Sequence, residues 1–60
     1  MPTHKDWEDA RNKRDSNARL AARALLQGRT ARALEFANRY DAWELTMSRI
    51  AQAMESEREG

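Results

Sequence analysis

Few side chains in this sequence have the chemistry that catalysis needs. His4 is the only histidine, and there is no cysteine. A nucleophile needs an adjacent base, and a metal or phosphate site needs matched ligands or a glycine-rich loop. None of these sets can be assembled from the residues present, and nearly all the acids stand at helical spacing from a base. We therefore expect a non-enzymatic protein with no cofactor, no metal and no small-molecule substrate.

The arginines are the residues that point to a binding chemistry. Residues 16–34 contain four arginines and no acid, whereas residues 1–15 are neutral and residues 35–60 have three arginines against six acids. Arginine is suited to phosphate contact, which makes nucleic acid one candidate partner. The alternative is that these charges lie in solvent or steer an antiparallel dimer. The four residues are Arg19, Arg23, Arg29 and Arg32.

The composition allows one small domain, over residues 1–60. Charged residues make up 35% of the chain, but the two signs nearly cancel at a net charge of +1. The lack of cysteine excludes a disulfide scaffold, and no apolar run has the length of a signal peptide or a membrane span. We expect a cytoplasmic protein that makes no membrane contact.

Local signals predict a first helix from about residue 4 to residue 26. Thr3 can cap its start, and Asp6 can return the hydrogen bond as the partner in a capping box. Gly28 is the only interior glycine and suits the left-handed position that follows a helix. We therefore expect a turn over residues 27–30.

A second helix is predicted from about residue 31 to residue 56, with Thr30 as its cap. The acidic tail over 57–60 opposes the helix dipole and is expected to fray. Asp15, Ser16 and Asn17 favour turns over helix interiors, so a break in the first helix is left open.

The second helix carries an uninterrupted apolar stripe. Six large residues, including the chain's only Phe, Tyr and Ile, follow one another at spacings of four, three, four, three and four. This spacing places them on one helix face, which another helix must cover. They are Phe36, Tyr40, Trp43, Met47, Ile50 and Met54.

Folding the chain back at Gly28 lays the first helix on this stripe and predicts an all-α, antiparallel two-helix hairpin. Small residues would then oppose large ones, layer by layer. Arg14 interrupts the covering face; we expect it to lie on Trp43 and pair with Glu44, or to fix the register as a polar core residue. The covering residues are Trp7, Ala10, Arg14, Ala18, Ala21, Ala22 and Leu25.

A second, thinner apolar surface is predicted away from the stripe. Leu34 and Leu45 stand eleven residues apart on the second helix, with alanines alongside. We expect this surface to be a protein interface through which two hairpins pack into a four-helix bundle. Its residues are Leu20, Ala24, Leu34, Ala42, Leu45 and Ala53.

Two functional hypotheses follow from these patterns. The first is a small interaction or regulatory protein, an adaptor or inhibitor, that binds itself or a larger protein through its helices. The second is a nucleic-acid-binding accessory protein that uses the arginines near the turn of a hairpin dimer. A subunit that folds only on its partner is a third interpretation.

Overall fold

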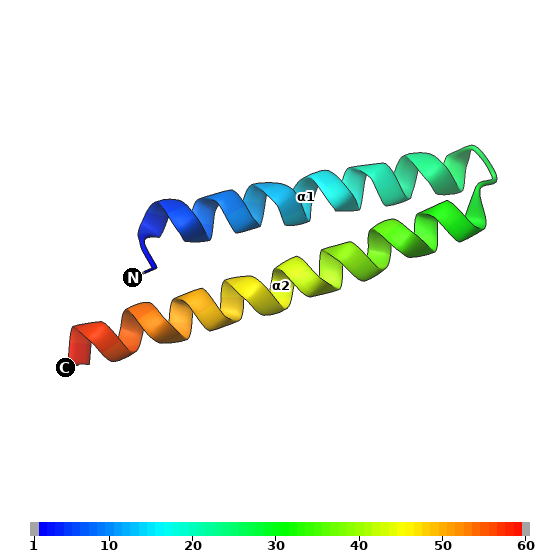
Figure 1. The fold of residues 1–60 in the computed structure, drawn as a ribbon. Coiled ribbons are helices and arrows are strands. Elements are labelled where there is room, and N and C mark those ends of the chain that lie inside the picture. The colour runs from blue at the N-terminus through cyan, green and yellow to red at the C-terminus, as the bar shows by residue number, and fades with distance from the viewer. Residues whose placement is uncertain (1, 60) are drawn as a thin grey trace.

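The computed structural model describes residues 2–59 and consists of two α-helices joined by a tight turn (Figure 1). Helix α1 spans His4–Leu26 and helix α2 spans Thr30–Glu59. The helices run antiparallel, so both chain ends lie at one end of a rod of 49 × 15 × 12 Å. No strand occurs within the described residues. The prediction of an all-α two-helix hairpin is confirmed.

The start of α1 is held by the capping box that the sequence predicts. The Asp6 backbone N–H donates to Thr3 Oγ1 at 3.2 Å, and the Thr3 backbone N–H donates to Asp6 Oδ2 at 2.9 Å. Two backbone donors that no carbonyl could reach are thereby satisfied. The first turn of α1 is fixed by side chains from its own sequence.

No break interrupts α1 at Asp15–Asn17. The Asn17 amide Nδ2 donates to the Lys13 carbonyl at 2.8 Å, one turn earlier. This bond uses the side chain's polar group within the helix, so it does not compete for a turn conformation. The alternative of two shorter helices is therefore not adopted.

The turn is a Schellman motif centred on Gly28. Its backbone N–H donates to the Leu25 carbonyl at 3.0 Å, and the Arg29 N–H donates to the Ala24 carbonyl at 2.8 Å. Gly28 has φ +74°, which lies in the left-handed region. This conformation is unfavourable for any residue that has a Cβ atom, but not for glycine. The chain reverses here because glycine permits this conformation.

The bounds of α2 differ from the prediction at both ends. The Arg29 carbonyl accepts the first helical bond, from the Ala33 N–H at 3.0 Å, so Thr30 is the first helical residue and not the cap. At the other end α2 continues past residue 56 to Glu59, although the glutamates of this segment outnumber Arg58 and oppose the helix dipole. Fraying of the tail is thus not seen up to Glu59, and Gly60 lies outside the described residues.

The face of α1 that covers α2 is partly different from the predicted one. A seven-residue repeat that starts at Trp7 points inward, because spacings of three and four keep one helix face towards a partner. Ala18, Ala22 and Leu25 stand one position off this repeat and are exposed, so the prediction was wrong for them. The inward residues are Trp7, Ala10, Arg14, Asn17, Ala21 and Ala24.

The stripe on α2 is covered as predicted, but only in part. Met47 is buried, and the other five stripe residues are half-buried. The buried residues of the described chain are Met47 and three alanines, and no side chain is completely buried. The accessible surface of 4753 Å² exceeds the roughly 4,000 Å² of a compact monomer of this mass. Two helices alone therefore make a thin core.

Candidate interaction surfaces

Arg14 joins the two helices near the middle of the hairpin. Its Nη1 lies 3.0 Å from Glu44 Oε1 on α2, and its Nη2 lies 3.1 Å from Asp15 Oδ1 on α1. Partial desolvation alone would lower the pKa of Arg14, but the hydrogen bonds to Asp15 and Glu44 outweigh it and raise that pKa. The predicted pairing with Glu44 is confirmed. The guanidinium lies over the Tyr40 ring, 5.8 Å from its centroid, and not over Trp43 as predicted.

Every Trp, Tyr and Phe ring has a cation over it. A half-covered ring presents a face with a negative quadrupole, and a long basic side chain can lie on that face while its charge stays in water. These side chains cover part of the stripe that α1 leaves open. The pairs are Arg11 on Trp7 at 5.4 Å, Lys13 on Trp43 at 4.8 Å, Arg14 on Tyr40 at 5.8 Å and Arg39 on Phe36 at 5.6 Å.

The structure brings three of the four turn-proximal arginines together. Arg23, Arg29 and Arg32 line one shallow groove of about 160 Å³, with Gln27 among its other residues. Arg19 does not line it. No ion pair among the described side chains of residues 2–58 involves any of the four arginines. Glu35 is an acid close to two of them, since it lines a second hollow with Arg29 and Arg32. The groove of Arg23, Arg29 and Arg32 is therefore rich in positive charge, with one acid beside it.

The six predicted interface residues do not form one surface. Ala24 is only 4% exposed and lies in the hairpin's own core, so it is not available to a partner in this fold. Its carbonyl also accepts the Arg29 N–H bond that closes the turn. Leu20 borders the groove between the helices. Leu34 and Leu45 are 63% and 52% exposed on the outer side of α2, with Ala42 exposed and Ala53 half-buried.

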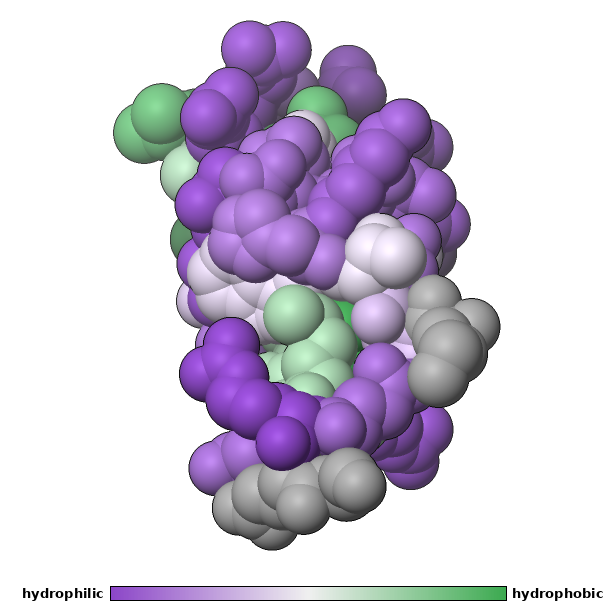
Figure 2. Space-filling view, turned by 90° about the vertical axis from the view of Figure 1, so that its left-hand side faces the viewer, coloured by the Kyte–Doolittle hydropathy of each residue, from purple (hydrophilic) through white to green (hydrophobic). Residues whose placement is uncertain are grey.

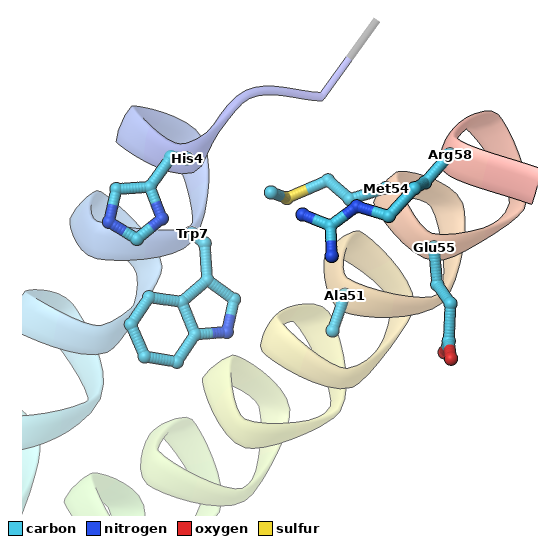
Figure 3. Close-up of a pocket in the computed structure, with 6 residues that line it drawn as sticks. All are labelled: His4, Trp7, Ala51, Met54, Glu55 and Arg58. Carbon is cyan, nitrogen blue, oxygen red and sulfur yellow. The ribbon is translucent and has the colours of Figure 1, made fainter.

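A cleft at the open end of the hairpin, where the two chain ends lie, was not predicted. It has a volume of about 350 Å³. Met54 and Arg58 extend from α2 towards α1, where His4 and Trp7 lie, whereas Glu55 points away (Figure 3). An end-on view shows an apolar patch framed by hydrophilic residues (Figure 2). The residues of this open-end cleft are His4, Trp7, Ala51, Met54, Glu55 and Arg58.

Two leucines at the turn end of the hairpin are exposed, which the sequence had not predicted. Leu26 is 90% exposed, more than any other large apolar side chain of the described chain, and Leu25 is 61% exposed. Both side chains lie off the inward face of α1, so α2 does not cover them. The sequence alone had placed Leu25 on that face.

The remaining polar side chains show no catalytic or metal-binding arrangement in the part of the chain that the structure describes. His4 Nε2 lies 3.1 Å from Glu8 Oε1, one turn along α1, and its ring stacks on Trp7 with centroids 6.0 Å apart. No group of three or more metal-ligating side chains gathers among the described side chains, which extend to Arg58. Neither described helix has an apolar stretch long enough to cross a bilayer.

No family model, curated protein or solved structure matches this chain.

Proposed function

We propose that this chain is a small non-enzymatic interaction protein, an adaptor or inhibitor, that acts through helix-to-helix contact with a second copy of itself or with a larger protein. The observation that supports this function is the incomplete cover of its apolar side chains. Five leucines are more than a third exposed, while three of the four buried residues are alanines.

The energies favour association over an isolated hairpin. Complete burial of one leucine contributes about 1.5–3 kcal/mol. A small domain has a net stability of only about 5–15 kcal/mol, so covering two or three leucines changes the folding equilibrium substantially. A partner that supplies this cover binds and stabilises the hairpin in one step.

A four-helix bundle is the proposed form of self-association. Two hairpins that pack side by side supply the second layer of helices that a thin two-helix core lacks. Alanines beside the exposed leucines allow the helices to approach closely. The outer leucines Leu34 and Leu45 are proposed as the contact for helices of a larger protein.

Sedimentation equilibrium over a wide range of protein concentration tests this proposal. We expect a mass that rises from the 7.0 kDa of one chain towards twice that value, with a strongly helical circular dichroism spectrum throughout. A fully helical, cooperatively melting monomer at every concentration would contradict self-association, because the hairpin would then be stable with its leucines in water.

Nucleic-acid binding is the second candidate function, supported by the groove that Arg23, Arg29 and Arg32 share. Three phosphate contacts would weaken binding of a DNA or RNA oligonucleotide roughly 20- to 40-fold between 50 and 200 mM salt. The double change Arg23→Ala and Arg29→Ala should abolish such binding without altering the thermal midpoint. Arg49→Ala is the control, because Arg49 is an exposed arginine of α2 that does not line the groove. Binding that survives the double change would exclude this function.

A further inference from the structure

The two ends of the hairpin are complementary in shape. The open end has the apolar cleft of about 350 Å³ between Trp7 on α1 and Met54 on α2. The turn end presents Leu25 and Leu26, which are 61% and 90% exposed. One end thus has an apolar hollow and the other has apolar side chains that nothing in the described chain covers.

The two ends are also complementary in charge. The four arginines of residues 16–34 have no acid among them. At the open end, residues 3–9 and 50–58 together hold five acids against two basic residues. Two copies that lie antiparallel therefore place each positive turn end beside a negative open end, whereas parallel copies would place like charges together.

The cleft and the leucine that could reach it from a second copy lie on the same side of the hairpin. Leu25 follows Trp7 by eighteen residues, which is about five helical turns, so both project from one side of α1. Ala33 and Ala51 have the same spacing on α2. One flank of the rod therefore carries the cleft at one end and Leu25 at the other.

We propose that a second copy of this chain binds this flank in antiparallel orientation, with Leu25 of each copy entering the open-end cleft of the other. The proposal rests on the self-association proposed above and names its contact. Two-fold symmetry makes each contact twice, so both clefts and both turn ends are used.

The Arg14 guanidinium, near the middle of the hairpin, is already paired with Asp15 and Glu44, so its own charge does not oppose an approaching copy. Glu55 and Arg58 give the rim of the cleft one charge of each sign. A cleft of this volume holds on the order of ten water molecules, and their release from Trp7, Ala51 and Met54 by leucine side chains favours binding.

Disulfide cross-linking between copies tests the proposal, because the natural chain has no cysteine. In one hairpin, Leu25 and Ala51 lie roughly 27 Å apart along the axis, so Leu25→Cys and Ala51→Cys cannot join within a chain. We expect the variant with both changes to become a covalent dimer under mild oxidation. Leu25→Cys alone should stay uncoupled, because antiparallel copies hold their turns at opposite ends.

A double variant that stays monomeric on a denaturing gel, or a Leu25→Cys variant that cross-links equally fast, would overturn the proposal. Leu25→Glu gives a second measurement that does not depend on oxidation. Since Leu25 is 61% exposed, this change should keep the helix content and yet weaken the dimer by roughly tenfold or more, because it places a charge in the cleft. An unchanged dimer affinity would contradict the contact.

Parallel measurements on the natural chain separate the two proposals. If the natural chain is dimeric, and the variants Leu34→Cys or Leu45→Cys cross-link instead of the cleft variant, only the assignment of the cleft is lost. If it is monomeric at every concentration, the self-association proposed as part of its function fails as well.

Discussion

Arg14 and Glu44 are thirty positions apart in the sequence, yet their side chains meet at 3.0 Å and join α1 to α2. The same guanidinium lies on Tyr40 and bonds Asp15, so one residue combines an ion pair, a hydrogen bond and an aromatic contact. Such a contact forms in only one register of the two helices. Arg14 therefore helps to set the alignment of the hairpin.

Replacing Arg14 should lower the thermal midpoint by removing this contact. We expect Arg14→Ala to be more damaging than Arg14→Lys, because lysine keeps a charge but loses the planar fork that holds both acids. Thermal unfolding followed by circular dichroism measures the difference. Arg49→Ala is the control; if it lowered the midpoint as much as Arg14→Ala does, the register role of Arg14 would be refuted.

Gly28 should resist substitution for reasons of backbone conformation alone. A Cβ atom built at this position meets no atom within 4 Å, so the strain comes from φ +74° and not from a clash. Gly28→Ala should therefore destabilise the hairpin by about 1–2 kcal/mol in urea unfolding. Gly28→Asn should cost less, because asparagine tolerates the left-handed region. Equal stability of the alanine variant and the natural chain would show that another turn is accessible.

A charge in the stripe should unfold the hairpin. Met47 is 7% exposed, so Met47→Asp would bury a carboxylate with no partner for it. Leu45 lies two positions away and is 52% exposed, which makes Leu45→Asp a matched control that should remain helical. Far-ultraviolet circular dichroism distinguishes the two variants. Full helicity of Met47→Asp would refute the packing of α1 on the stripe.

The capping box should affect the open-end cleft as well as helix stability. Thr3→Ala removes the acceptor of the Asp6 N–H and should cost about 1 kcal/mol, while Thr3→Ser should keep most of it. Fraying of the first turn would also displace His4 and Trp7, two residues of the cleft. Faster hydrogen exchange at the Asp6 and Trp7 amides in the alanine variant, compared with the serine variant, is the expected result.

Local signals explain what could be predicted from the sequence. Thr3 with Asp6, Gly28 and the Phe36–Met54 stripe each specify structure through neighbours within one or two turns, and each forms as expected. The inward face of α1 was harder, because its alanines are alike and a repeat displaced by one position satisfies the same pattern. The observed turn geometry selects Ala24 over Leu25 for the interior.

The interaction surfaces could be predicted less well than the fold. Whether an apolar residue is exposed depends on how closely the facing helix packs against it. The sequence does not show how much apolar surface two helices leave uncovered. Leu34 and Leu45 were recognised as outer residues, but Leu26 and the cleft between Trp7 and Met54 depend on where each helix ends. Their positions follow only from the assembled hairpin.

The central claim is that this hairpin functions by associating through its helices, and the concentration dependence of its thermal unfolding tests this claim most directly. Association with a second copy couples folding to binding, so the midpoint should rise steadily as the protein concentration is increased a hundredfold. The cooperativity should be retained throughout. A midpoint that stays constant over that range, with full helicity at the lowest concentration, would contradict self-association of the hairpin.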